Sequence, residues 1–294
     1  DAFATLNVVD LLVDDDLTVT DDVAIGGILG VTGAVNFAAD VTFADGADII
    51  TASAGTSNFR AGVNAGNSIA SGGNYNVVVG DEAGTAITTG DNNTAVGFEA
   101  LKTVTTASDN TAVGLSALKL NTSGLQNTAV GGGVMAANTS GARNTAVGYQ
   151  SLDANTEGDD NTSFGRRSLS TNTTGSDNTA FGTQALALNL TGSDNVAVGL
   201  NAGLSVTTGI QNTLVGSLAG DALTDADYNV AIGTDALHSD TLGSRSLAIG
   251  RRALYTQNFT TATDSYNIGI GFGAGFAVTT GTVNTLIGAL AGDA

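Results

Sequence analysis

A short motif that returns every 17 residues limits what this 294-residue chain can fold into. The motif is an Asn, any residue, a small residue, a β-branched or aromatic residue, and a Gly. Ten copies follow one another without a break, from Asn76 to Asn229. Ser246 takes the next place, Asn267 follows after 21 residues, and Asn284 comes after another 17. Such a period is typical of repeat architectures, in which each copy forms one unit that stacks on the next.

Other columns keep the same register when the Asn is counted as position 1. Position 4 is Val, Ile or Phe from Val79 to Ile287, and position 5 is Gly from Gly80 to Gly288. Positions 8 and 9 mostly read Ala-Leu, Ser-Leu or Ala-Gly, and position 15 is Gly in most copies. The copies lack the 3.6-residue period of a helix, whereas the residues after the Asn alternate as in a strand. Gly at positions 5 and 15 would allow sharp corners.

We therefore predict an all-β fold over residues 53–294, a repetitive parallel β-solenoid (β-roll) of 17-residue coils. Each coil is expected to have two short strands and two turns, and to bury the side chains at positions 4 and 9. The Asn side chains are expected to form a structural ladder, each bonded to the next and to turn backbone. The predicted Asn ladder consists of Asn76, Asn93, Asn110, Asn127, Asn144, Asn161, Asn178, Asn195, Asn212, Asn229, Asn267 and Asn284.

Residues 10–51 follow a different, six-residue period, with apolar residues at the second and fourth places, as in Leu11 with Val13 and Val41 with Phe43. This alternation predicts one short strand per hexad. Either three hexads of one chain close a triangular coil, or three chains each supply one side. One chain alone would have too small a core, so we favour the second arrangement. We predict an intertwined, trimeric hexad-repeat β-stem over residues 1–52.

The composition excludes several classes of function. The chain has no Cys and only one His, His238, which removes disulfides, zinc-thiolate sites and His-based metal clusters. It also has no Pro, as expected of a long ladder in which every backbone N–H is used. The net charge of −19 argues against binding to nucleic acid or to anionic membranes. No apolar run is long enough to cross a bilayer. We find no catalytic motif, and we expect neither an enzyme nor a cofactor.

The predicted coil is too thin to be stable alone, because two bulky side chains are few for 17 ordered residues. The alternation of a bulky position 4 with a small position 3 suggests that a second face of the strand meets another chain. We therefore expect a homo-oligomer.

The copies resemble the left-handed parallel β-roll heads of trimeric autotransporter adhesins, and Asn93-Thr94-Ala95-Val96-Gly97 carries this match. Residues 58–294 are covered, with a coil a little longer than is usual in that family. The hexad segment from Asp16 to Val35 resembles the shafts of bacteriophage tail fibres, in which Asn-Thr-Ala-Val-Gly arrays also occur. Both families are trimeric, extracellular and engaged in attachment to cells, so the resemblance implies a homotrimer. The order of hexads and array favours the tail fibre.

A few residues could contact a ligand. Arg166 with Arg167 and Arg251 with Arg252 occupy positions 6 and 7 of two coils that are five periods apart. Paired Arg side chains suit phosphate or carboxylate groups of glycans, although salt bridges to neighbouring acids would explain them too. Aromatic side chains near the four-residue insertion, Tyr255 and Phe259, could grip a sugar ring, or the insertion could be a simple spacer.

Acidic residues in the hexad turns could hold Ca²⁺ between chains, because hard oxygen ligands suit that ion. We favour solvated turns instead and predict no metal site. The residues concerned are Asp14, Asp15, Asp16, Asp21, Asp22, Asp45 and Asp48.

The function that we expect is that of a non-enzymatic structural fibre for attachment to a cell surface, in particular a phage tail fibre shaft. The alternative is a bacterial trimeric surface adhesin or an extracellular filament subunit. In either case the partners would be further copies of the chain and a cell-surface glycan or protein receptor, in an extracellular location. The last coil is open at Ala294. Because a rod needs a cap, we expect further sequence or end-to-end docking of another subunit.

Overall fold

The structure is a computed structural model of one chain, and it describes residues 55–293. The predicted hexad-repeat stem and its Asp-rich turns lie outside the described residues.

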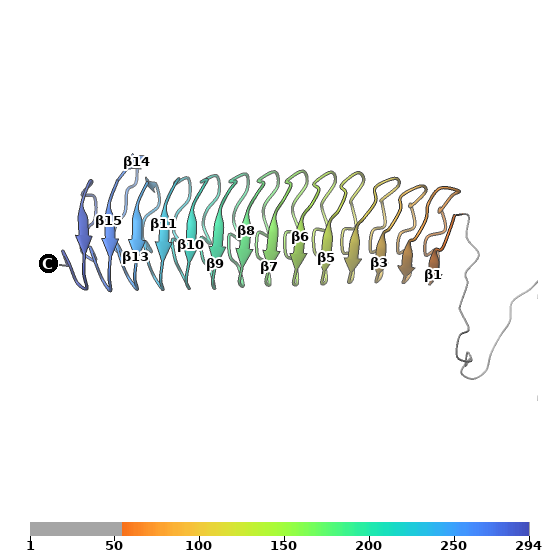
Figure 1. The fold of residues 1–294 in the computed structure, drawn as a ribbon, viewed down its shortest axis with the longest axis horizontal. Coiled ribbons are helices and arrows are strands. Elements are labelled where there is room, and N and C mark those ends of the chain that lie inside the picture. Colours follow the sequence, from red (N-terminus) through yellow and green to blue (C-terminus); the bar gives the residue numbers. More distant parts are fainter. Residues whose placement is uncertain (1–54, 294) are drawn as a thin grey trace, which may run out of the picture. The chain divides into compact units, whose positions relative to one another are not determined.

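Residues 55–293 form a parallel β-solenoid, in which each coil adds one strand to a single sheet (Figure 1). This sheet has 14 strands, all of them parallel to their neighbours, in chain order apart from the omission of β12 and β14. The strands are β1 (Phe59–Ala61), β2 (Val77–Val79), β3 (Thr94–Val96), β4 (Thr111–Val113), β5 (Thr128–Val130), β6 (Thr145–Val147), β7 (Thr162–Phe164), β8 (Thr179–Phe181), β9 (Val196–Val198), β10 (Thr213–Val215), β11 (Val230–Ile232), β13 (Leu247–Ile249), β15 (Ile268–Ile270) and β16 (Thr285–Ile287).

The register of the sheet follows the sequence period. In β7 and β8, Thr162 lies opposite Thr179 and Phe164 opposite Phe181, so each residue pairs with its equivalent one coil later. The same rule holds across the 21-residue coil, where Ile249 pairs with Ile270. The prediction of a parallel β-solenoid with 17-residue coils is therefore confirmed.

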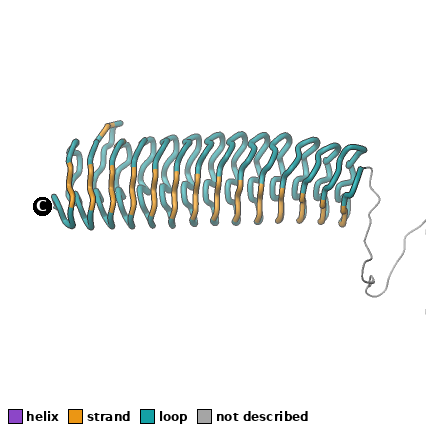
Figure 2. Tube along the Cα trace, in the orientation of Figure 1, coloured by secondary structure: helices purple, strands orange, loops and turns teal. Residues whose placement is uncertain are grey.

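The prediction of two strands per coil is wrong for the described residues, because the strands form one line and turns make up the rest of each coil (Figure 2). Positions 7 and 9 take left-handed backbone conformations, as in Glu99 and Leu101 with φ of 58° and 49°, and these interrupt an extended strand. Hydrogen bonds still join the coils there: the Leu101 N–H donates to the Ala117 carbonyl at 3.0 Å. The second sheet is one short pair, β12 (Gly243–Ser244) with β14 (Thr263–Asp264), at the insertion that projects in Figure 1.

The core is narrow and lies between the sheet and the turns. Position 9 is buried as predicted, and Leu118, Leu152 and Leu169 are fully inaccessible to solvent. Small side chains at positions 3 and 8, such as Ala112 and Ala117, let the two sides of each coil approach closely.

The prediction that position 4 is buried is wrong, because position 4 points outward and position 3 points inward. Phe181 and Ile232 at position 4 are 41% and 38% exposed, whereas Ala180 at position 3 is fully buried. The reason is the alternation of a strand: the Asn at position 1 is buried, which places position 3 inside and positions 2 and 4 outside. The sheet therefore has an apolar outer face.

The Gly column at position 5 lets successive coils come into contact through their backbones. Gly182 has a φ of +139°, and a Cβ atom on it would lie 2.4 Å from the Gly199 carbonyl oxygen of the next coil. A side chain at this corner would therefore force the coils apart. Within residues 55–293, no helix has the length and apolar character that crossing a bilayer requires.

Candidate functional site

The predicted Asn ladder at position 1 is present and buried. The Asn161 Nδ2 donates to Asn144 Oδ1 at 3.1 Å and to the Gly175 carbonyl at 2.9 Å. The Asn161 Oδ1 accepts hydrogen bonds from the backbone N–H and the Nδ2 of Asn178, both at 3.1 Å. Each Asn thus satisfies groups in its own coil and in both neighbouring coils, which is a structural role and leaves the amide unavailable to a ligand.

A second Asn ladder, at position 12, was not predicted. It consists of Asn121, Asn138, Asn155, Asn172 and Asn189, all fully buried. In this ladder the Asn155 Nδ2 donates to Asn138 Oδ1 at 2.7 Å and to the Gly158 carbonyl at 3.0 Å. The column of five Asn residues at one position was visible in the sequence and would have revealed it. Neighbouring coils place Val104 and Val206 at the same position.

At the 21-residue coil a different polar cluster takes over from the first ladder. The Gln257 Nε2 donates to Asp240 Oδ2 at 2.6 Å and to Ser246 Oγ at 2.8 Å. The Gln257 Oε1 accepts from Asn267 Nδ2 at 2.8 Å, where the ladder resumes. Asp240 is fully buried, and its Oδ1 also accepts from the backbone N–H groups of Gly243 and Phe259, each at 3.0 Å. This cluster therefore closes the gap that Ser246 leaves in the ladder.

The outer face of the 14-stranded sheet is an uncharged surface that recurs from coil to coil. We define it as the side chains at positions 2 and 4, which are Thr or apolar residues from β2 to β16. Val130, Phe181, Val198 and Ile232 are each between 36% and 41% exposed. Phe164 and Phe181 stack on it, with ring centroids 4.8 Å apart. Large exposed side chains also occur at position 6, in the turn that follows the strand: Phe98, Leu115, Tyr149 and Leu200.

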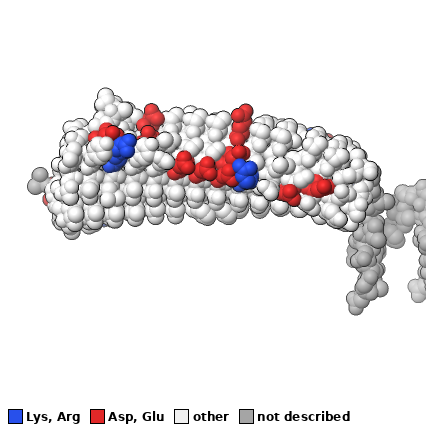
Figure 3. Space-filling view, turned by 45° about the horizontal axis from the view of Figure 1, so that its top comes forward, with Lys and Arg blue, Asp and Glu red and all other residues white. Residues whose placement is uncertain are grey.

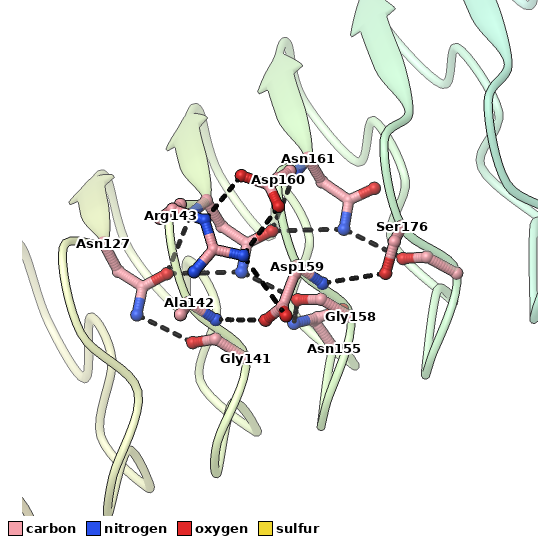
Figure 4. Close-up of polar contacts among 12 residues, drawn as sticks. Asn127, Gly141, Ala142, Arg143, Asn155, Gly158, Asp159, Asp160, Asn161 and Ser176 are labelled. Atoms are coloured by element: carbon pink, nitrogen blue, oxygen red, sulfur yellow. Dashed lines mark hydrogen bonds and ion pairs between the residues drawn. The ribbon is translucent and has the colours of Figure 1, made fainter.

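Most charged side chains lie on the turns, and one group of them occupies positions 16 and 17. The Arg143 guanidinium binds Asp160 through two contacts, of 2.8 Å and 2.7 Å, and reaches Asp159 at 3.5 Å (Figure 4). This hydrogen-bonded guanidinium lowers the pKa of the Asp160 carboxyl. Figure 3 shows acidic side chains in an interrupted row along the stack, beside large uncharged areas.

The first predicted Arg pair lies on the turn side of its coil. Arg166 and Arg167 are both exposed. The Arg167 Nε donates to Gln150 Oε1 at 3.2 Å. Arg167 also lines an open groove with a volume of about 460 Å³.

The second predicted Arg pair is engaged with neighbouring side chains. The Arg252 Nε lies 3.4 Å from Asp235 Oδ2, and its guanidinium lies 5.4 Å from the centre of the Tyr255 ring. The Arg251 guanidinium lies 5.8 Å from the centre of the Phe272 ring.

The predicted aromatic contacts do not lie together on an exposed loop. The Tyr255 ring is stacked between His238 and Phe276, at 4.9 Å and 5.2 Å. Phe259 is only 6% exposed, and its ring lies against Gly243. Phe259 is therefore unavailable to a ligand, because the polar cluster around Asp240 holds its backbone inward.

Among the described residues, no group of three or more His, Asp or Glu side chains could hold a metal ion. Comparison of the chain with models of protein families, with curated proteins and with solved structures gave no match.

Proposed function

We propose that this chain is a structural fibre subunit that associates with copies of itself through the outer face of its sheet. The observation that supports this proposal is the column of apolar side chains at position 4, which continues through all 14 strands of the sheet. Water-soluble monomers rarely expose a contiguous apolar surface of this kind, so the face needs a partner.

The geometry of the face favours a second copy of the same chain as that partner. Its side chains recur once per coil, at the spacing of neighbouring strands, about 4.8 Å. Another copy, in parallel register, presents side chains at the same spacing over the same length. The absence of charged side chains at positions 2 and 4 of strands β2 to β16 removes like-charge repulsion between identical faces.

The number of copies and the biological role are proposed on the resemblance to trimeric fibres. A homotrimer would enclose the three outer faces along a common axis and leave the turns on the outside. Such a rod fits an extracellular phage tail fibre shaft that attaches the particle to a cell-surface receptor. The alternative proposal is a bacterial surface adhesin or filament subunit. Neighbouring genes separate the two: tail and baseplate genes accompany a fibre, and a membrane anchor or secretion gene accompanies an adhesin.

Sedimentation of the full chain and of two matched double variants tests the association. Phe181→Asp with Val198→Asp places two charges on the outer face. Thr174→Asp with Thr191→Asp places two charges on exposed turn residues of adjacent coils. We expect the wild type and the turn variant to sediment as trimers, and the face variant to sediment as a smaller species. A folded wild-type monomer at micromolar concentration, or an intact trimer in the face variant, would refute the proposed interface.

A further inference from the structure

A groove crosses four coils on the turn side of the solenoid, away from the outer face of the sheet. Its lining includes Gln150 and Asp153 at one end and Leu204 at the other. The groove exists because position 10 becomes small between these ends, with Ser170 and then Ala187. Its volume of about 460 Å³ lies within the range of small-molecule sites.

One wall of the groove carries hydrogen-bonding side chains at position 7. The Arg167 Nε donates to Gln150, which leaves both terminal guanidinium nitrogens without a hydrogen-bond partner among the described residues. Gln184 follows one coil later and is half-buried. A guanidinium with two nitrogens available matches the two oxygens of a carboxylate.

The other side of the groove combines an apolar surface with a single acid. Leu188, which is 46% exposed, and Leu204 offer apolar contact. Asp153 has one carboxylate oxygen, Oδ1, that is buried and has no hydrogen-bond partner. Burial raises the pKa of the Asp153 carboxyl, and a backbone hydrogen bond and, to a smaller extent, the charge of Arg167 partly offset that shift.

We propose that this groove binds an acidic sugar, with its carboxylate on Arg167 and its ring against Leu188. The amide of Gln184 and the hydroxyl of Ser170 line the same groove and suit the sugar hydroxyls. The single positive charge and the nearby Asp153 favour a singly charged carboxylate over a phosphate, because a second negative charge would face the acid. The length of the groove, across four coils, suits a short chain of sugars rather than one ring.

The biological setting of this site rests on the attachment role proposed above, but binding to the groove does not depend on the oligomeric state. Calorimetric titration of the full chain with tetragalacturonate tests the site. Separate titrations with cellotetraose, which is a neutral sugar, and with tetraglutamate, which is an acidic peptide, serve as comparisons. Sedimentation of the same samples reports the association separately. If the chain does not bind tetragalacturonate but sediments as a trimer, the proposed binding site is refuted and the proposed association is not.

Two variants should change the affinity in opposite directions. Arg167→Gln should weaken tetragalacturonate binding about tenfold, because it removes the charged partner of the carboxylate. Asp153→Asn should strengthen binding, because it removes a repelling charge. Arg143→Gln is the matched control: it removes the same charge from the opposite corner, where Arg143 binds Asp160, and should leave the affinity unchanged.

The proposal is overturned if the wild type binds no tetragalacturonate at millimolar concentration. It is equally overturned if Arg167→Gln binds as tightly as the wild type, or if Arg143→Gln weakens binding to the same extent. Tetraglutamate or cellotetraose binding as tightly as tetragalacturonate would refute the assignment to an acidic sugar. Circular dichroism of each variant checks that the solenoid is intact.

Discussion

The same exchange, Asn to Val, should have very different effects in the two Asn ladders. Asn161→Val, in the ladder at position 1, removes four hydrogen bonds, and it leaves the buried backbone N–H of Asn178 without an acceptor. Asn121→Val, at the first place of the position-12 ladder, removes two. There the Gly124 carbonyl keeps the Nδ2 of Asn110 as a donor, and Asn138 keeps the Gly141 carbonyl as an acceptor.

The magnitudes follow from these partners. A net loss of about 1 kcal/mol for each hydrogen bond, with a further cost of about 1–3 kcal/mol for an orphaned buried donor, gives about 3–5 kcal/mol for Asn161→Val after the gain from an apolar side chain. Asn121→Val should cost about 1 kcal/mol or less. Val104 already occupies position 12 in the preceding coil, so Val fits there.

Urea unfolding, followed by circular dichroism at one fixed protein concentration, measures the difference in free energy of unfolding. Fixed concentration matters because association shifts apparent stability. Hydrogen exchange at the backbone N–H of Asn178 adds a local measurement. This N–H should exchange faster in Asn161→Val than in the wild type, and it should be unchanged in Asn121→Val. Equal destabilisation by the two exchanges, within about 0.5 kcal/mol, would refute the reasoning that the position-1 ladder carries backbone groups that nothing else can satisfy.

Three further predictions concern the core, the corners and the half-buried Asp153. Leu169→Ala should lower the free energy of unfolding by about 2–5 kcal/mol in urea unfolding, because the side chain is fully buried, and an effect below 1 kcal/mol would contradict the burial. Gly182→Ala should cost about 3 kcal/mol, because of its backbone angle and the contact with the next coil. Gly132→Ala, whose Cβ would meet nothing closer than 3.7 Å, should be nearly neutral in the same urea unfolding assay. Asp153→Asn should be more stable than the wild type at pH 7. The pKa of Asp153 is raised in the folded state, so the wild type regains this stability as pH falls through that pKa. The difference in urea midpoints between the variant and the wild type should therefore shrink towards pH 4. A difference that grows as pH falls would refute this prediction.

The period of the sequence was sufficient to predict the coil, the register and the first Asn ladder. These follow from columns of one residue type, and stacking in register is the arrangement that lets each Asn bond to its equivalents. The orientation of the strand was predicted wrongly, because bulky Val and Ile at position 4 suggested burial more strongly than Ala at position 3. The orientation is set by the Asn at position 1, whose side chain must point inward to bond to buried backbone groups. Because side chains alternate along a strand, position 3 then also faces inward and position 4 faces outward.

The number of strands and the groove could not be predicted for a different reason. The left-handed backbone at Leu101, a residue that seldom adopts it, replaced the second strand by turns. The groove depends on the small size of Ser170 and Ala187 relative to Asp153 and Leu204, which lie one or two coils away in the same column. A pattern search within one coil does not compare these residues, so Arg167 was found as a member of a pair rather than as part of a cavity wall.

The uniform columns also affect how the chain finds its correct alignment during folding. Pairing β6 with β8 in place of β7 would still match Asn with Asn and Gly with Gly, and would leave one whole coil looped out. The ladders alone do not penalise such a slip. Gln257 and Asp240 form a contact that occurs in one place only within residues 55–293. The buried hydroxyls of Ser151 and Ser163, which lie 2.8 Å apart where most coils have Ala, are a second local irregularity. These irregular coils are therefore where the alignment of an otherwise degenerate array is specified, and replacing them with the consensus coil should produce mixtures of misaligned chains.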